Sequence, residues 1–229
     1  MTKIKFTIIS LFNDALKPYL ETSMMWKAAD KGIAEFDFVD LREFGLGPHK
    51  KVDDTPYGGG DGMLMRCEPI FAAIESIKEK DPDAKVIVPT PADKLWNQKE
   101  AQSFADQAVA TTDKPIHLII FCPHYEGIDE RVYSIVDYRY RLGEYVLTGG
   151  ELPALIMIDS IVRLIPGVLG GENSAIIESF SNGNNIEFPQ YTKPDDFRGM
   201  KVPEILLSGN HGAVDKWREE QSKTTADFE

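Results

Sequence analysis

The sequence predicts an α/β protein built on a mostly parallel sheet with helices on both faces. Short apolar, β-prone runs alternate along the chain with longer segments of helical periodicity, as parallel sheets with crossover helices require. Three expected strands, ending near Val88, Phe121 and Leu147, each run into a loop rich in glycine or proline. Ligands of such sheets bind beyond the carboxyl ends of the strands, so these loops predict a shared binding site.

The expected strands are apolar runs bounded by turn residues. The first run opens the chain, the second alternates polar and apolar side chains, and the other three are buried-type runs. The last of them ends in the pair Gly149-Gly150, which removes two Cβ atoms where backbone must pass close to something. The strands are expected at residues 4–9, 33–41, 85–88, 116–122 and 145–148.

The expected helices have caps or one-sided apolar faces. Asn13 or Asp14 can cap the first helix and Gly32 can stop it, while Pro153 fits the first turn of the fourth. In the second helix, apolar side chains recur at helical spacing on one face. The helices are expected at residues 13–29, 68–80, 98–110, 154–164 and 213–221. Residues 42–65 form a long loop, and a loop of that length is usually functional or disordered.

Composition indicates a folded cytoplasmic protein without a membrane partner. Hydrophobic residues make up 42% of the chain and charged residues 27%, which fits a packed core. Two cysteines are too few for a disulfide framework, and no apolar run approaches about 18 residues. The net charge of −12 argues against nucleic acid, but cations gathered at residues 42–51 leave a local basic face open.

Several familiar site types do not fit. The glycine-rich segment 53–62 lacks the Lys-Ser/Thr ending of a P-loop, and Asp61 would repel phosphate. No Gly-x-Gly-x-x-Gly follows the first strand, which counts against an ordinary NAD enzyme. None of the four histidines stands at metal-ligand spacing from cysteine or carboxylate, so no metal site is expected.

Five loop segments together carry a more specific signal than any glycine turn alone. They are residues 52–60, 125–132, 143–153, 163–170 and 206–211. In content and order they resemble the bacterial tRNA (guanine-N1)-methyltransferases, a family of the trefoil-knotted (SPOUT) methyltransferases. The resemblance covers almost the whole chain. It implies a homodimer that transfers a methyl group from S-adenosyl-L-methionine to N1 of guanine 37, the base 3′ of the tRNA anticodon.

The resemblance also implies a deep trefoil knot around the cofactor, formed by the three loops after the predicted strands. Its backbone groups would hydrogen-bond the adenosyl group, and Leu142 and Leu147 would supply apolar walls. Because Pro123 has no N–H, a cofactor contact there must use its carbonyl. The implied cofactor-binding residues are Val88, Thr90 and Pro91 in the first loop, Pro123, Tyr125, Glu126 and Gly127 in the second, and Leu142, Gly143, Glu144, Tyr145, Val146, Leu147, Gly149, Gly150 and Pro153 in the third.

Guanine N1 carries a proton, so methyl transfer needs a general base near N1 and a cation or donor near O6. The resemblance places the base in the interdomain linker, where the family has an aspartate and this chain has Glu178. The extra methylene moves the carboxylate by about one C–C bond, ~1.5 Å. Arg163 carries over as the group that stabilises the developing oxyanion. As alternatives, Glu178 is a solvated linker carboxylate and Arg163 an ordinary helix-end cation.

The sequence pattern changes after residue 167, which predicts three parts: a large domain at 1–168, a linker at 169–178 and a small, mainly helical domain at 179–229. The resemblance implies that the large domain is the knotted, cofactor-binding one. The resemblance implies that the small domain grips tRNA, and Arg198, Lys216 and Arg218 are its candidate phosphate contacts. It also implies assistance by Mg²⁺, which would act through RNA and nearby carboxylates. A non-catalytic RNA- or nucleotide-binding protein of the same fold stays open as the alternative function.

Overall fold

The computed structural model describes residues 2–111, 113–171, 178–181 and 183–228. Its chain divides into two compact units, Met1–Gly170 and Gly171–Glu229. The first unit contains one five-stranded sheet in the order β2-β1-β6-β5-β7. All neighbouring strands in this sheet run parallel, so their carboxyl ends meet at one edge. The strands are β1 (Ile4–Ser10), β2 (Ala34–Asp40), β5 (Lys85–Leu95), β6 (Ile116–Phe121) and β7 (Tyr138–Arg141).

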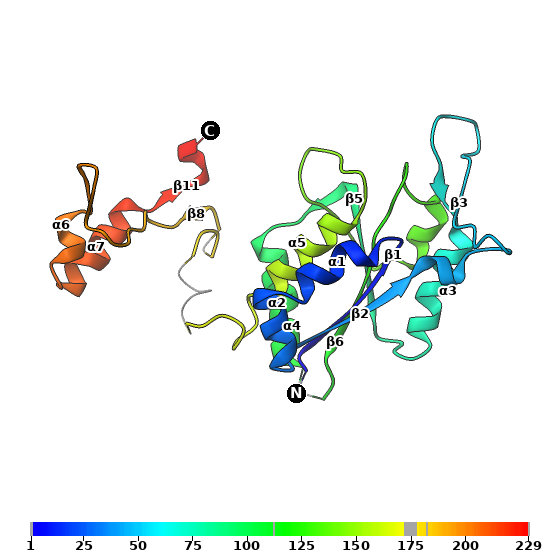
Figure 1. Ribbon diagram of the computed structural model, residues 1–229, viewed down its shortest axis with the longest axis horizontal. Coiled ribbons are helices and arrows are strands. Elements are labelled where there is room, and N and C mark those ends of the chain that lie inside the picture. The colour runs from blue at the N-terminus through cyan, green and yellow to red at the C-terminus, as the bar shows by residue number, and fades with distance from the viewer. Residues whose placement is uncertain (1, 112, 172–177, 182, 229) are drawn as a thin grey trace. The chain divides into compact units, whose positions relative to one another are not determined.

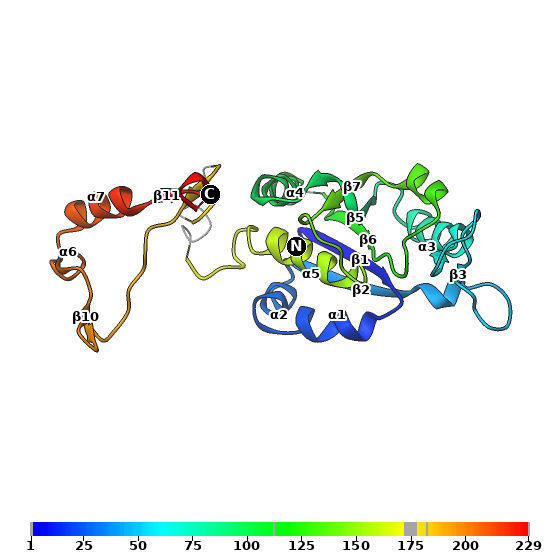
Figure 2. The ribbon, with the colours of Figure 1, turned by 90° about the horizontal axis from the view of Figure 1, so that it is seen from above.

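Helices cover both faces of the sheet, as the sequence predicts (Figure 1). The helix α3 (Cys67–Lys78) lies on one face, with the 3₁₀ turns η1 (Leu41–Phe44) and η2 (Glu130–Ile135). On the other face, α1 (Asn13–Leu20) and α2 (Ser23–Asp30) pack beside β2, and α4 (Gln98–Ala110) lies toward β5 and β7 (Figure 2). Between them runs α5 (Glu151–Val162), which contacts α1, α2 and α4.

The core is packed on both sides of the central strands. Ile119 and Phe121 of β6 face the apolar cluster that includes Ile70 and Ile74 of α3. Leu118 and Ile120, which alternate with them, are at most 2% exposed on the opposite face. Strands buried on both faces read as continuous apolar runs, which explains why the sequence pattern locates β6 so well.

Three sequence-based expectations about secondary structure were wrong. The predicted helix 13–29 is two helices, because Pro18 weakens the end of α1 and Ser23 takes a left-handed φ of +52°. The Thr22 hydroxyl donates to the Pro18 carbonyl at the break. The first loop is not a loop throughout, since β5 continues to Leu95 and pairs with β7 again after an irregularity between Pro89 and Lys94.

The third error concerns the predicted strand 145–148. The strand at that edge is β7, four residues long and paired with β5, whereas Tyr145 and Val146 are 57% and 80% exposed. They lie on a surface loop, and their apolar side chains do not pack in the core. Alternation in Tyr138-Arg139-Tyr140-Arg141 is the strand signal that the sequence analysis missed.

Within residues 42–65, which the sequence predicts to be a long loop, the structure has a short antiparallel hairpin of β3 (Asp53–Asp54) and β4 (Leu64–Met65). The described residues of the second unit form two small antiparallel ladders and two helices. Its elements are β8 (Asn185–Ile186), β9 (Asp196–Phe197), β10 (Met200–Lys201), α6 (Glu204–Leu207), α7 (His211–Gln221), β11 (Lys223–Thr224) and the 3₁₀ turn η3 (Thr225–Phe228). Within the described residues, every helix is too short or too polar to cross a bilayer.

Candidate active site

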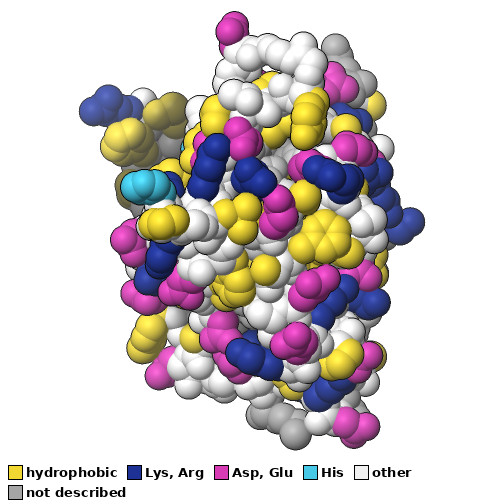
Figure 3. All heavy atoms as spheres, turned by 90° about the vertical axis from the view of Figure 1, so that its right-hand side faces the viewer, with side chains coloured by type: hydrophobic (Ala, Val, Ile, Leu, Met, Phe, Trp, Pro, Cys, Tyr) yellow, Lys and Arg dark blue, Asp and Glu magenta, His cyan; other side chains and the backbone are white. Residues whose placement is uncertain are grey.

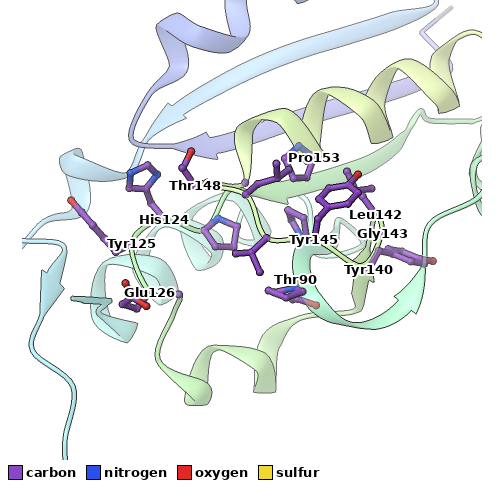
Figure 4. Close-up of a pocket in the computed structure, with 18 residues that line it drawn as sticks. Thr90, His124, Tyr125, Glu126, Tyr140, Leu142, Gly143, Tyr145, Thr148 and Pro153 are labelled. Atoms are coloured by element: carbon purple, nitrogen blue, oxygen red, sulfur yellow. The ribbon is translucent and has the colours of Figure 1, made fainter. Parts of the chain in front are cut away.

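A cavity of about 190 Å³ opens at the carboxyl edge of the sheet, where the irregular segment of β5 between Pro89 and Lys94 meets the loops after β6 and β7 (Figure 4). Its walls come from these three segments and the first turn of α5. The lining residues are Pro89, Thr90, Pro91, Pro123, His124, Tyr125, Glu126, Gly127, Tyr140, Leu142, Gly143, Tyr145, Val146, Leu147, Thr148, Gly149, Gly150 and Pro153. The structure therefore brings together the three loops that the sequence singled out.

All the predicted cofactor-binding residues line this cavity except Val88 and Glu144. Val88 is fully buried in the core cluster beneath α3. The side chain of Glu144 is 91% exposed, and its carboxylate lies 3.6 Å from Arg141. Sequence reasoning missed four lining residues: Pro89, His124, Tyr140 and Thr148. Pro89, His124 and Thr148 are direct sequence neighbours of predicted residues, and Tyr140 is the buried residue of β7. The signal that could have found the first three is their position within the predicted loops.

The loop after β6 is held by the β3–β4 hairpin. The Glu126 amide donates to the Met63 carbonyl at 3.0 Å, and the Met65 amide donates to the Gly127 carbonyl at 2.9 Å. Tyr125 takes a left-handed φ of +60°, a strained conformation for a side chain of this size. This backbone conformation turns the loop at Tyr125, and both Tyr125 and Glu126 line the cavity.

The loop after β7 packs tightly against the loop after β6. The Gly150 amide donates to the Pro123 carbonyl at 2.7 Å. A Cβ atom on Gly150 would lie 2.8 Å from both the Cys122 Cα and the Pro123 nitrogen, which are backbone atoms. The glycine is therefore required for this approach. Because the Pro123 carbonyl already accepts this bond, a cofactor contact there would use its second lone pair.

The irregular segment of β5 between Pro89 and Lys94 is held by its own polar contacts. The Thr90 hydroxyl donates to the Ala92 carbonyl at 2.8 Å, and Asp93, with φ of +70°, pairs with Arg139 at 2.9 Å. At the other rim, Tyr145, Val146 and Leu147 offer exposed apolar surface. The cavity thus combines apolar walls with backbone donors and acceptors, the usual make-up of a small-molecule site.

Comparison with known proteins identifies the family. The model of the tRNA (guanine-1)-methyltransferase TrmD family matches residues 4–229.

This chain belongs to that family.

Curated relatives agree with this assignment. A protein of Lacticaseibacillus paracasei named tRNA (guanine-N(1)-)-methyltransferase is 47% identical over 220 residues, covering 96% of this chain and 82% of the relative. Relatives of the same name from Listeria welshimeri and Dictyoglomus turgidum are each 46% identical. Those matches cover 96% of this chain and 87% and 85% of the relatives, so the family resemblance extends over nearly the whole protein.

The two predicted catalytic residues do not lie among the cavity-lining residues of this tRNA (guanine-1)-methyltransferase family member. Arg163 is the C-cap of α5, at the opposite end of that helix from Gly150. Since α5 has 12 residues, its ends are separated by about 18 Å. Glu178 belongs to the second unit, where its carbonyl accepts from the Ser181 amide at 3.2 Å. The catalytic roles of both residues stay predictions.

Charge on the end of the first unit that carries α3 and the hairpin is mixed. Figure 3 shows Lys and Arg side chains interspersed with Asp and Glu over this face. Several of the cations are paired: Lys51 with Asp54 at 2.9 Å, and Arg66 with Asp54 and Glu68, both at 2.7 Å. The basic stretch 42–51 therefore does not produce a broad single-sign surface on this face. No group of three or more metal-ligating His, Cys, Asp or Glu occurs among the residues that the structure describes.

Proposed function

We propose that this protein transfers a methyl group from S-adenosyl-L-methionine to N1 of guanine 37 of tRNA. The observation that carries the proposal is the cavity at the carboxyl edge of the sheet, in a chain of this family. A cytoplasmic location follows from a tRNA substrate.

The donor set of the cavity fits the cofactor. Its apolar walls, formed by Leu142, Val146 and Leu147, suit the adenine ring, and the loop amides and carbonyls suit the polar edges of adenosine. We also propose that the three loops form a trefoil knot here, with the glycine pair 149–150 allowing one loop to pass against the next. When bound, S-adenosyl-L-methionine supplies an electrophilic methyl group on its sulfonium.

The protein must then make guanine N1 a nucleophile. We assign Glu178 as the general base that removes the N1 proton, because a carboxylate within hydrogen-bond reach can do so. Arg163 stabilises the negative charge that develops on O6 as the proton leaves. These roles require both side chains to face a base held at the mouth of the cavity.

A second copy of the chain makes this arrangement attainable, so we propose a homodimer. Within one chain, Arg163 is separated from the Gly150 end of α5 by the full length of the helix. The helix also exposes apolar side chains one turn apart, Leu152 at 62% and Ile156 at 49%. Nearby helices expose Tyr19 at 47% and Trp26 at 54%. An apolar face of this kind is typical of a subunit interface, and a partner docked on it could present its own Arg163.

The small C-terminal domain, residues 179–229, is the proposed tRNA-gripping part, joined through the linker 169–178. Its candidate phosphate contacts are engaged locally: Lys216 lies 3.8 Å from Glu220, Arg218 3.4 Å from Asp215, and Arg198 packs on the Phe197 ring. Salt bridges at the surface are weak, so these cations can exchange partners for phosphates. Mg²⁺ would act through the RNA and nearby carboxylates.

The test is methyl transfer from labelled S-adenosyl-L-methionine to unmodified tRNA in which base 37 is varied. We expect transfer only with guanine at that position. Glu178→Ala should lower kcat by about 10²- to 10⁴-fold, because it removes the general base, while cofactor affinity stays the same. Glu178→Asp, which restores the family's residue, is the matched control and should retain activity.

Failure has two distinguishable forms. If the protein binds the cofactor but methylates no tRNA, the non-catalytic RNA- or nucleotide-binding alternative holds. If Glu178→Ala keeps full activity with guanine-37 tRNA, the enzyme assignment stands but another group is the base.

A further inference from the structure

His124 is the one cavity-lining histidine among the described residues, and its ring packs against two other aromatic rings. Its ring centroid lies 4.8 Å from that of Phe12 and 5.0 Å from that of Tyr125. Its backbone amide contacts the Met65 sulfur at 3.0 Å, and its backbone forms a bridge with Gly149. The ring therefore has little freedom to turn toward solvent.

Despite this fixed position, the Nδ1 atom of His124 is buried and has no hydrogen-bond partner within the described part of the chain. A buried polar atom without a partner is unfavourable, and in native proteins it usually has a specific reason. The nearest charged atom that faces it is the Glu151 Oε2, at 4.0 Å. This separation is beyond hydrogen-bonding distance but short enough to close with a small loop movement.

Glu151 is prepared for such a contact. It is the first residue of α5, where the helix dipole favours a carboxylate, and its side chain is only 13% exposed. Its other oxygen, Oε1, accepts from the Ser10 hydroxyl at 2.7 Å, and that hydroxyl accepts from the Phe12 amide at 2.8 Å. The carboxylate is thus tied to the end of β1, with Oε2 directed toward His124.

Gly149 keeps the space between the two groups open. A Cβ atom on Gly149 would collide with the Glu151 Oε2 and would lie 2.8 Å from the His124 Nδ1. Any larger residue would therefore keep the imidazole and the carboxylate apart. Gly149 itself lines the cavity, as His124 does, and Figure 4 shows His124 at the end of the cavity that also carries Thr148.

We propose that His124 is a positioning residue whose Nδ1–H donates to the Glu151 Oε2 when S-adenosyl-L-methionine fills the cavity. The inference rests on the proposed function. The bond ties the loop after β6 to the loop after β7 and to the start of α5, and so fixes the walls around the cofactor. The open form carries an unpaired buried nitrogen, and cofactor binding gives that nitrogen its partner. Tyr125 and Glu126 of the same loop are the other titratable groups beside this ring that line the cavity.

The deciding variant is His124→Phe, which keeps an aromatic ring against Phe12 and Tyr125 but removes the donor. We expect the KM for S-adenosyl-L-methionine to rise about tenfold, the effect of losing a hydrogen bond to a charged group. We expect kcat and the KM for tRNA to change less than twofold. Stability without cofactor should be equal to or above that of the parent, because an unpaired buried nitrogen is removed.

Three further variants separate positioning from simple packing. His124→Asn places an amide donor near the position of Nδ1 and should recover most of the cofactor affinity. Glu151→Gln keeps an accepting oxygen but loses the charge, so it should weaken cofactor binding less than His124→Phe does. The double variant His124→Phe/Glu151→Gln should bind the cofactor no worse than His124→Phe alone, because both changes act through the same bond. His49→Gln, on an exposed loop, is the matched control and should leave cofactor affinity unchanged.

A measurement on the parent protein needs no variant. With ¹⁵N-labelled histidine, the His124 Nδ1 resonance should shift in the direction of a hydrogen-bonded N–H when S-adenosyl-L-methionine is added. If the cofactor binds and the Nδ1 resonance does not shift, or His124→Phe leaves the cofactor KM unchanged, the inference is wrong while the proposed function stands. If the parent protein binds no cofactor at all, the proposed function itself fails.

Discussion

A histidine lies near each end of β6, and the two differ in whether their ring nitrogens have hydrogen-bond partners. His117, the second residue of the strand, has both ring nitrogens partnered: Nε2 with the Thr7 hydroxyl at 2.8 Å and Nδ1 with Asp81 at 3.0 Å. His124, just beyond the carboxyl end, has a buried Nδ1 whose nearest carboxylate is 4.0 Å away. At the amino end of β6 both ring nitrogens of His117 have hydrogen-bond partners, whereas beyond the carboxyl end the Nδ1 of His124 has none among the described residues.

The contrast separates what holds the fold from what serves the site. A satisfied buried histidine stabilises the folded state and needs no ligand. A buried nitrogen left without a partner costs stability, and in native proteins it usually has a specific reason. Substitutions at the amino end should therefore change stability and spare cofactor binding. Substitutions around His124, at the carboxyl end of β6, should weaken cofactor binding, whether or not they also change stability.

The largest effect is expected for Gly150→Ala at the carboxyl end. The new Cβ would lie 2.8 Å from backbone atoms of Cys122 and Pro123, and backbone cannot move aside as a flexible side chain can. The resulting displacement of the loops, of the order of 1 Å, should lower kcat/KM for the cofactor about 100-fold. Overpacking should cost only about 1–3 kcal/mol of unfolding free energy.

Steady-state kinetics and urea unfolding measure the two effects on the same sample. Gly212→Ala is the matched control, because the nearest atom to its new Cβ is 3.8 Å away and the residue lies within α7. Retention of cofactor kcat/KM in Gly150→Ala would show that the close approach of the loops is not needed for binding.

The second prediction concerns His117 at the amino end. His117→Gln should lower the unfolding free energy by about 1–3 kcal/mol, because Thr7 and Asp81 lose a well-placed partner. The KM for the cofactor should not change. Burial lowers the pKa of His117, so the unfolded chain takes up a proton near pH 6.5 that the folded chain does not. The parent should therefore lose stability as the pH falls through that range.

Urea unfolding at pH 7.5, 6.5 and 5.5 checks this prediction. The difference between parent and His117→Gln should shrink as the pH falls, since the variant lacks the buried imidazole while the other three histidines are common to both proteins. A difference that grows toward low pH would mean that the folded protein holds His117 as a cation.

The same division explains which structural features could be predicted from the sequence. Buried parallel strands such as β6 are continuous apolar runs, and α4 was predicted at its observed bounds, residues 98–110. Strand residues that are buried on both faces are apolar at every position, because water is excluded on both sides. The exposed run Tyr145 to Leu147 defeated the same reasoning, since its apolar side chains line a cavity and not the core. Periodicity does not distinguish these two uses of an apolar residue.

The site was predictable only as far as its loops. Glycine and proline punctuation located the three loops, and family resemblance supplied most of the lining residues. His124 was missed because a single histidine in a loop produces no sequence pattern. Its neighbour Glu151, 4.0 Å away, lies 27 positions further along the chain, so their proximity is not visible in the sequence. The unpaired state of its Nδ1 is a tertiary property, set by burial under Phe12 and by the backbone of Gly149.

The smallest expected effect tests whether satisfaction of polar groups, rather than location, decides the outcome. Asn97 follows the carboxyl end of β5, yet its polar side chain has a partner: its Oδ1 accepts from the Glu100 amide at 3.1 Å and caps α4. Asn97→Ala should cost about 1 kcal/mol of unfolding free energy, the usual effect of losing an N-cap, and should leave cofactor affinity unchanged. Asn97→Asp, which keeps an accepting oxygen, should restore the stability. Thermal unfolding and cofactor titration of the three proteins decide the matter. If Asn97→Ala weakened cofactor binding more than it lowered stability, proximity to the loops would matter more than hydrogen-bond satisfaction, and the contrast between His117 and His124 would lose its meaning.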